Sequence, residues 1–358
     1  MVQKTEMDLR GRVSLRINKA MQDRVFPGCA VGVVKRNGDR IVLPFGRFTY
    51  DSDSGVVKND TVYDVASVTK SIPAASLLLT LVDEGLVTLD DPVIKYIPEF
   101  GNYDDKKSVL VRHLLTYTLN LIVPSTASLK LKTADEIIDA IVKAPLRHPP
   151  GTTYLYTNST ALVIGLLVRN ASGKNIDDFA NERFFKFLGM SCSTFHPERL
   201  AKNEIVPTEF DDWRGRLVQG EVHDESSYVL NKKFILGISG LFSTVPDLLN
   251  FLEMVINKGE LHGRKYFSPK IIGAMSSNQL SSINESGGLG WELNQPRFMG
   301  NHSATTFGKT GFTGCLVLCD IKKGIGMAML SNTIYPRRKP DATAINEVRR
   351  DIANILFG

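Results

Sequence analysis

Hydrophobic residues recur at strand-like spacing near both ends of the chain, whereas helix-like spacing dominates its middle. Residues 30–34 and 41–45 flank Asn37-Gly38, a dipeptide typical of a tight hairpin because both central residues of such a turn need positive φ. The two ends can together form one antiparallel sheet, with the middle of the chain inserted into it. Further strands are expected over residues 289–293, 305–309, 315–320 and 326–331.

Helical patterns fill most of the remaining chain. Spacings of three and four residues predict a helix that starts at Ser67 and that Gly85 ends. Two terminal helices, over residues 8–24 and 341–356, would cover the sheet. Other helices are expected over residues 108–117, 134–144, 159–172 and 176–187.

These patterns predict an α+β fold with two domains. Residues 1–65 and 240–358 would form a discontinuous domain, an antiparallel sheet flanked by the terminal helices. Residues 66–239 would form an inserted, mostly helical domain. Because small-molecule sites usually lie at domain junctions, a site is expected in the cleft between the two.

Composition excludes several classes of protein. The 358 residues include 43 Lys and Arg against 38 Asp and Glu, a net charge of +5, with no dense basic run. Nucleic-acid binding therefore has no support, and we interpret the basic cluster Arg337-Arg338-Lys339 as a solvated loop. Four scattered cysteines, with no histidine near Cys315 and Cys319, predict neither a disulfide framework nor a metal site. No cofactor is expected.

The sequence also bears on location. No stretch reaches the ~20 apolar residues of a membrane helix. The first residues, MVQKTEMDLRGRVSL, have neither an apolar core nor a small-residue cleavage site, so they are not interpreted as a signal peptide. We expect a cytoplasmic protein from the sequence as it stands, or a periplasmic or secreted one if an export signal has been removed. The oligomeric state does not follow from the sequence.

Ser67-Val68-Thr69-Lys70 is the first candidate for chemistry. On a helix, residues three apart share a face, so Lys70 could reach the Ser67 hydroxyl. Serine becomes a good nucleophile when a neighbour takes its proton, and a lysine can do so if burial or positive charge lowers its pKa from ~10.4. A helix start also supplies N–H groups that favour an oxyanion. The alternative is a surface capping serine beside a solvated lysine.

Tyr156-Thr157-Asn158 precedes a predicted helix. Side chains two apart in an extended segment point the same way, so Tyr156 and Asn158 would face one site. A phenol can relay protons, and an amide can hold a substrate carbonyl. The alternative is a packed aromatic residue followed by an Asn N-cap.

Lys309-Thr310-Gly311 ends a predicted strand. This segment does not fit a phosphate-binding P-loop, because Ser303 occupies the place of the first glycine and a strand follows. Lys309 and Thr310 could instead hold an anionic substrate group, while Gly311 lets a substrate lie close to the backbone. The alternative is a glycine-rich hairpin turn.

The three motifs S-x-x-K, Y-x-N and K-T-G each occur once, in this order. This constellation resembles the serine β-lactamase and penicillin-binding protein superfamily, specifically its class C β-lactamase and family VIII carboxylesterase branch. The resemblance covers nearly the whole chain. Other segments that carry it are residues 65–70, 83–86, 89–92, 222–224, 240–244 and 310–314.

The resemblance implies a β-lactamase-like fold and a serine hydrolase that acts through an acyl-enzyme on a small ester, amide or β-lactam. Ser67 would attack the carbonyl, with Lys70 and Tyr156 sharing the proton. The backbone N–H groups of Ser67 and Phe312 would form the oxyanion hole. Water would then release the acyl group, with Tyr156 as its activator.

The remaining motif residues would bind the substrate. Asn158 would orient the acyl group, and Lys309, Thr310 and Gly311 would line the substrate site. The positive charges of Lys70 and Lys309 would lower the pKa of Tyr156 and favour a tyrosinate.

Departures from the family pattern leave alternatives open. Residues 115–121 stand where relatives usually have a His-Thr-Ser-Gly-Leu segment, which would change the cleft wall. Lys309 stands where the branch often has histidine, and lysine there is closer to enzymes that bind a substrate carboxylate. The alternatives are a D-alanyl carboxypeptidase or D-amino-acid peptidase, a transacylase, and a β-lactam-binding sensor. A Ser-His-Asp hydrolase lacks support, because the chain has no G-x-S-x-G elbow and His223-Asp224 are neighbours in sequence.

Overall fold

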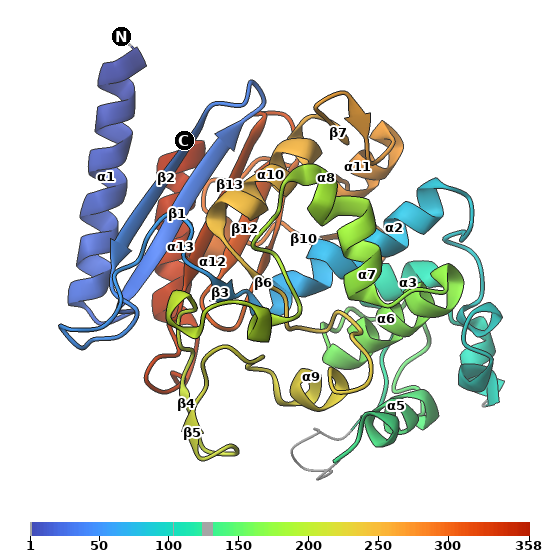
Figure 1. Cartoon of the computed structure of the whole chain (residues 1–358). Helices are drawn as coiled ribbons and strands as arrows, with labels where there is room; N and C mark the ends of the chain where they lie inside the picture. The colour runs from blue at the N-terminus through green and yellow to red at the C-terminus, as the bar shows by residue number, and fades with distance from the viewer. Residues whose placement is uncertain (1, 103, 124–131) are drawn as a thin grey trace.

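A seven-stranded antiparallel sheet forms one half of the molecule, in the strand order β2-β1-β13-β12-β11-β10-β9 (Figure 1). The structure is a computed structural model that describes residues 2–102, 104–123 and 132–358. Its first strand, β1 (Gly28–Lys35), pairs with β2 (Arg40–Gly46) on one side and with the last strand, β13 (Ile325–Ser331), on the other. The predicted assembly of one antiparallel sheet from both ends of the chain is therefore confirmed.

The C-terminal strands follow the sequence pattern with one exception. β11 (Thr306–Thr310), β12 (Leu316–Asp320) and β13 lie close to their predicted ranges. The single strand expected over residues 289–293 is wrong. Gly290 has φ +78°, which turns the chain, so that β9 (Gly287–Gly288) and β10 (Trp291–Leu293) pair as a hairpin instead. Alternation of apolar residues continued across this turn and concealed it.

Helices cover both faces of the sheet. α1 (Val2–Gln22) and α13 (Thr343–Phe357) pack on the face that receives Val31, as predicted (Figure 1). α10 (Val245–Ile256) packs on the opposite face, which receives Ala30 and Val34. The sequence analysis missed α10, although its polar residues Asp247, Asn250 and Glu253 recur every three positions in an otherwise apolar segment.

The middle of the chain packs as helices beside the sheet (Figure 1). The predicted helices 134–144 and 159–172 are confirmed, but 108–117 is shorter and 176–187 is broken into pieces by a π-helical turn, Asn181–Phe185. The proposed domain boundaries stay a prediction. The helices not yet named are α2 (Ser76–Asp83), α3 (Val111–Leu115), α5 (Ala134–Lys143), α6 (Asn158–Ser172), α7 (Ile176–Ala180), α8 (Lys186–Leu188), α9 (Glu225–Leu230), α11 (Pro269–Ser276) and α12 (Pro296–Met299).

Three two-stranded sheets complete the fold. β3 and β6 bring residues 63–64, just before Ser67, against residues 242–243, whereas the other two pairs are local hairpins. Their bounds are β3 (Tyr63–Asp64), β6 (Phe242–Ser243), β4 (Phe210–Asp211), β5 (Arg216–Leu217), β7 (Glu260–Leu261) and β8 (Arg264–Lys265). Within the described residues, no helix has both the length and the apolar character needed to cross a membrane.

The helix expected from Ser67 to Gly85 is not continuous. Residues Ala66–Lys70 form a 3₁₀ turn, Ser71–Ala75 a π-helical turn, and only α2 is a regular α-helix. Ile72 leaves the helical region, with φ −117° and ψ 105°. The cause is Pro73, since proline disfavours the α conformation in the residue before it. The prediction overlooked this proline, although the chain does turn out of α2 at Gly85 as expected.

We expect Gly165→Ala to destabilise the protein, although alanine normally stabilises a helix interior by about 1 kcal/mol relative to glycine. A Cβ at Gly165, in α6, would lie 2.0 Å from the carbonyl oxygen of Leu236. The free energy of unfolding, measured by urea denaturation, should fall by about 1–3 kcal/mol. Gly273→Ala is the matched control, because nothing lies within 4 Å of its Cβ position in α11. Equal or greater stability of Gly165→Ala would contradict this packing.

Candidate active site

The segment before Ser67 has a strained backbone. Ala66 has φ +46°, a left-handed conformation that costs a non-glycine residue about 1–3 kcal/mol. Its N–H donates to Asp64 Oδ1 at 2.8 Å, and its carbonyl accepts from Thr69 Oγ1 at 2.6 Å. The N–H of Val65 donates to the carbonyl of Leu241 at 3.0 Å. These bonds hold Ser67 at the start of the 3₁₀ turn.

Lys70 lies against Ser67, as the three-residue spacing indicates. Its Nζ donates to Ser67 Oγ at 2.9 Å and to the carbonyl oxygen of Ile238 at 2.6 Å. Burial, with a smaller contribution from the charge of Lys309, lowers the pKa of Lys70 to about 7, although the charges of Asp224 and Glu292 oppose this effect. Near neutral pH a large share of Lys70 is therefore the free amine, which can accept the Ser67 proton.

Tyr156 completes a cluster with Ser67 and the two lysines. Its hydroxyl is buried and interacts with Ser67 without the geometry of a full hydrogen bond. Lys309 Nζ lies 3.7 Å from the centre of the Tyr156 ring, and Lys70 Nζ lies 5.6 Å from it.

The expected tyrosinate is wrong. Burial raises the pKa of Tyr156 well above its usual value, and the negative charges of Glu292 and Asp224 raise it further. The reasoning from sequence counted the two lysines and missed the two carboxylates that offset them. Tyr156 is therefore a neutral phenol in the resting site.

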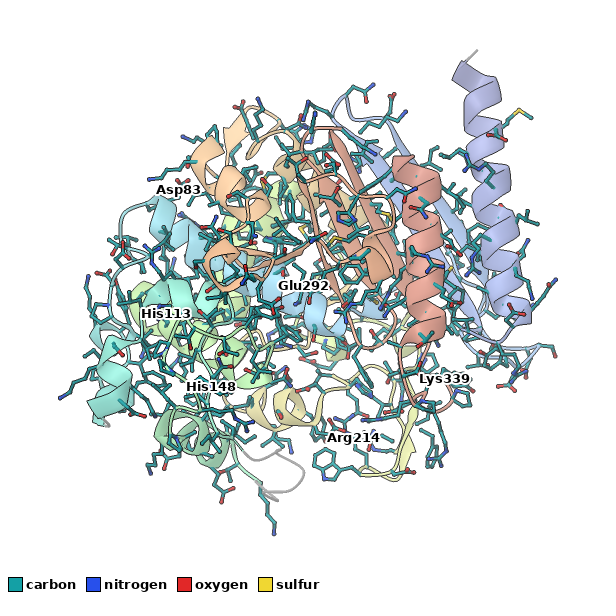
Figure 2. All side chains as sticks on the ribbon, turned by 180° about the vertical axis from the view of Figure 1, so that it is seen from behind. Asp83, His113, His148, Arg214, Glu292 and Lys339 are labelled. Atoms are coloured by element: carbon teal, nitrogen blue, oxygen red, sulfur yellow. The ribbon has the colours of Figure 1, made fainter. Side chains whose placement is uncertain are left out.

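Lys309 is buried rather than free. Its side chain is 2% exposed and forms an ion pair with Glu292, with 3.2 Å between Nζ and Oε1. The two residues lie on neighbouring strands, β11 and β10. Figure 2 shows Glu292 inside the molecule, between the sheet and the helical half. No sequence signal pointed to Glu292, because the strand register that pairs the two residues was not known.

Asn158 lies at the first turn of α6. The N-cap of this helix is Thr157, whose side chain accepts the N–H of Thr160, so Asn158 is free for another contact. Asn158 Nδ2 donates to Asp224 Oδ2 at 3.2 Å. Asp224 in turn caps α9 through the N–H of Ser227. The structure therefore brings Asn158 to Asp224, a residue to which the sequence analysis gave no role in the site.

Gly311 allows the end of β11 to lie against the nucleophile segment. A Cβ at this position would be 2.3 Å from the carbonyl oxygen of Val65. The close approach is thus made by the protein's own backbone, whereas we expected a substrate there. Arg349, from α13, donates through Nη2 to the carbonyls of Gly311 at 2.8 Å and Cys315 at 2.9 Å. No sequence signal pointed to this arginine, since it lies in an ordinary amphipathic helix.

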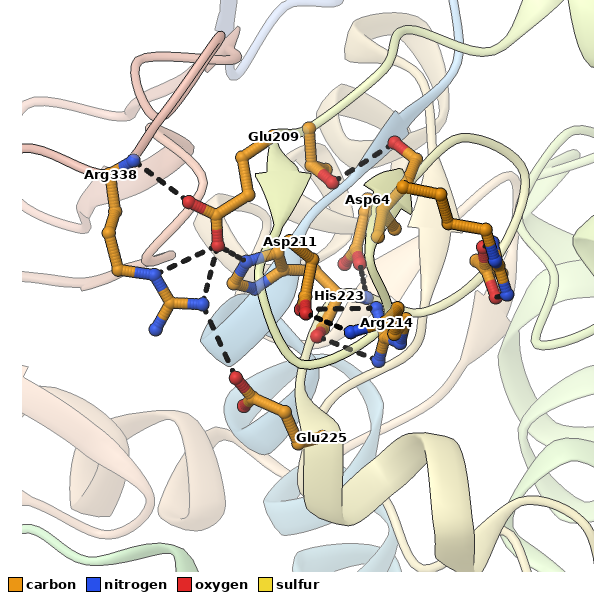
Figure 3. Close-up of polar contacts among 11 residues, drawn as sticks. Asp64, Glu209, Asp211, Arg214, His223, Glu225 and Arg338 are labelled. Atoms are coloured by element: carbon orange, nitrogen blue, oxygen red, sulfur yellow. Dashed lines mark hydrogen bonds and ion pairs between the residues drawn. The ribbon is translucent and has the colours of Figure 1, made fainter. Parts of the chain in front are cut away.

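A polar network of His223, Glu209 and Arg338 (Figure 3) lies behind Phe312. Phe312 is 52% exposed and lines the same cavity as Ser67. The His223 ring stacks on the Phe312 ring, with 5.5 Å between centres, and bonds Glu209 Oε1 through Nε2 at 2.7 Å. Arg338 Nε donates to the same Glu209 oxygen at 2.9 Å. Burial raises the pKa of Glu209, but hydrogen bonds from His223 and Arg338 outweigh it and lower the pKa to about 2.

This network adds a contact to the basic cluster. Arg337, Arg338 and Lys339 lie in an exposed loop, as expected, but Arg338 also bonds the buried Glu209 carboxylate, and Arg337 pairs with the exposed Asp212. Lys339 lines the cavity that opens at Ser67. His223 is bonded to Glu209 rather than to its sequence neighbour Asp224, which agrees with the rejection of a Ser-His-Asp mechanism.

A cavity of about 580 Å³ opens at Ser67 and Tyr156. Thr310, Gly311 and Phe312 line the same end. Further along, the lining is mostly apolar, with cations from several elements. Within the described part of the chain, no group of three or more His, Cys, Asp or Glu side chains could hold a metal ion. Apolar lining residues include Val25, Phe298, Ile334 and Ile345, and cationic ones are Arg24, Arg297, Lys339 and Arg349.

Comparison with known proteins identifies the family. A family model described as Beta-lactamase matches residues 14–350. The chain belongs to the Beta-lactamase family, and the predicted membership of the serine β-lactamase and penicillin-binding protein superfamily is confirmed. It is a serine hydrolase of this superfamily.

Individual relatives are distant. A protein of Escherichia coli K12, provisionally named a D-alanyl-D-alanine carboxypeptidase, is 26% identical over 316 residues, which cover 78% of this chain and 72% of the relative. A mutant of simvastatin synthase (LovD) from Aspergillus terreus has a TM-score of 0.75 at 19% identity, with 98% and 97% coverage. EstCE1, described as a hydrolase with promiscuous acyltransferase activity, has a TM-score of 0.77 at 16% identity, with 98% and 99% coverage. At these identities the two structures show the shared fold.

The lowered pKa of Lys70 predicts how activity depends on pH. Below about pH 7 Lys70 holds a proton and cannot accept one, so kcat/KM for an activated ester should fall about tenfold per pH unit. Asp224→Asn removes a negative charge that raises the pKa of Lys70, so this acidic limb should move to lower pH. Asparagine also serves as an N-cap, which preserves α9.

The matched control is Asp139→Asn, which removes an exposed carboxylate of α5 that pairs with Lys143. Its pH profile should coincide with that of the unmodified protein. An acidic limb that stays in place in Asp224→Asn, or moves to higher pH, would show that Asp224 does not act on Lys70.

Proposed function

We propose that this protein hydrolyses small esters or amides through an acyl-enzyme on Ser67. The observation that carries the proposal is the contact of 2.9 Å between Lys70 Nζ and Ser67 Oγ, made by a buried lysine whose pKa is lowered to about 7. A serine hydroxyl beside a buried free amine is an activated nucleophile.

Acylation uses Lys70 as the base. Its free amine takes the Ser67 proton while Ser67 Oγ attacks the substrate carbonyl. The N–H groups of Ser67 and Phe312 are proposed to stabilise the resulting oxyanion, and both residues line the cavity. The carbonyl re-forms as the bond to the leaving group breaks. The proton then passes from Lys70 to the leaving group, which departs as an alcohol or amine.

Tyr156 is proposed as the relay for this proton. Because its raised pKa keeps it protonated, it can donate to the leaving group and recover a proton from Lys70. In deacylation a water molecule replaces the leaving group and attacks the acyl-enzyme. Its proton returns through Tyr156 and Lys70 to Ser67 Oγ, and the carboxylic acid leaves.

Substrate contacts are proposed from the cavity lining. Thr310 and Gly311 lie beside Ser67, in support of their predicted place in the substrate site, and the apolar lining suits an acyl chain. Asn158 is proposed to orient the acyl group, although in the resting site its amide is held by Asp224.

Acyl transfer is the second candidate function. An alcohol that takes the place of water in the deacylation step would leave with the acyl group, and no other change in chemistry is needed. Two structural neighbours favour this possibility, since one is named a synthase and the other a hydrolase with promiscuous acyltransferase activity. Comparing ester product with free acid, when a primary alcohol is added, separates transfer from hydrolysis.

Ser67→Ala tests the proposal directly. Without the nucleophile, hydrolysis of p-nitrophenyl butyrate should fall about 10³-fold or more. Intact-protein mass spectrometry should show a butyryl adduct on the unmodified protein and none on the variant, and benzylpenicillin tests a β-lactam in the same way. Ser191→Ala, at an exposed serine, is the control and should retain activity. Near-normal turnover by Ser67→Ala would refute the mechanism.

A further inference from the structure

The buried pair of Lys309 and Glu292 carries an inference about substrate charge that rests on the proposed function. A lysine at the end of β11 is expected to bind a substrate carboxylate if its ammonium reaches the cavity. Here the Lys309 side chain is 2% exposed and the Glu292 side chain 10% exposed, so both charges are removed from water. Thr310 and Gly311, the next residues of the strand, line the cavity in its place.

Aromatic rings enclose the ammonium on its other sides. Lys309 Nζ lies 3.7 Å from the centre of the Tyr156 ring and 5.4 Å from that of Tyr117. The two rings also pack on each other, with 5.0 Å between centres. Tyr117 belongs to the segment 115–121, where the sequence departs from the family pattern. Together with Glu292, these rings occupy the space around Nζ that a substrate carboxylate would need.

The charge balance around Lys309 also opposes a second carboxylate. One ammonium already faces one carboxylate, so a substrate anion entering here gains no net attraction and must lose its hydration. Lys309 is paired with Glu292 Oε1, whereas Glu292 Oε2 is buried and accepts no hydrogen bond from the described residues. The charge of Glu292 also raises the pKa of Lys70, Tyr154 and Tyr156, which shows that it acts across the site.

We propose that Glu292 is a specificity-determining residue. By pairing with Lys309, Glu292 neutralises the positive charge that would bind a carboxylate beside the scissile bond. The substrates are therefore esters or amides whose leaving group carries no negative charge. Lys309 then contacts the Tyr156 ring through a cation–π interaction and helps to position it. The cations that line the cavity, among them Arg24, Arg297 and Lys339, come from elements other than β11 and do not replace it at this position.

A matched pair of substrates tests the proposal. The acetate esters of 3-hydroxybenzoate and of methyl 3-hydroxybenzoate differ only in whether the leaving group carries a carboxylate. The ratio of kcat/KM for the charged ester to that for the neutral ester should be about 1 or lower in the unmodified protein. Glu292→Gln keeps an oxygen acceptor for Lys309 but removes the charge, so the ratio should rise about tenfold, the effect of one charge-assisted hydrogen bond.

A second variant shows whether Lys309 is the cause. In Glu292→Gln/Lys309→Met the gain should disappear, because no ammonium remains to bind the carboxylate. Arg297→Gln is the control for a cation elsewhere in the cavity. In the double variant Glu292→Gln/Arg297→Gln, the ratio of kcat/KM for the charged ester to that for the neutral ester should stay as high as in Glu292→Gln alone. A gain that persists without Lys309 would overturn the proposal.

The unmodified protein provides a test even if Glu292→Gln fails to fold. A preference of tenfold or more for the charged ester, abolished by Ser67→Ala, would overturn the role of Glu292 and leave the acyl-enzyme mechanism intact. Hydrolysis of both esters that is independent of Ser67 would instead refute the proposed function. The two failures are therefore distinguishable in the same set of assays.

Discussion

Asp64 connects three segments that are far apart in sequence, and the site depends on it. Its carboxylate accepts the N–H of Ala66 at 2.8 Å, which holds the strained residue before the nucleophile, and the N–H of His223 at 2.8 Å. Its carbonyl accepts the hydroxyl of Thr313, just after Phe312, at 2.8 Å. Burial raises the pKa of Asp64, and these backbone donors oppose that effect. One residue thus fixes both walls of the proposed oxyanion hole relative to each other.

The sequence was sufficient where the information is local. Alternation predicted the sheet, and three-residue spacing placed Lys70 beside Ser67. It failed where contacts depend on strand register or on the packing of distant segments. The pairing of Glu292 with Lys309 requires the register of β10 and β11, and the contact of Asp224 with Asn158 joins residues 66 positions apart. The error on the pKa of Tyr156 followed from both omissions, since burial and the charges of Glu292 and Asp224 raise that pKa.

Two other errors had signals that were visible but misread. Pro73 disfavours helical geometry at Ile72, and Gly290 permits the turn between β9 and β10. Each lies inside an otherwise regular hydrophobic pattern, and the prediction followed that pattern rather than the single proline or glycine that interrupts it. The interior charges follow a simple rule: Lys70 and Lys309 are balanced by Asp224 and Glu292. Buried ion pairs add little net stability, so this arrangement is better explained by chemistry than by folding.

The position of β13 between β1 and β12 has a consequence for biosynthesis. β1 leaves the ribosome long before β13, although both β2 and β13 are needed to cover its two edges. Until then, the β1–β2 hairpin presents an unpaired edge that can join another chain. Closing contacts across almost 300 residues is also slow. Completion of the sheet therefore waits until β13 has been made, and production at low temperature or with a chaperone should favour the folded enzyme over aggregates.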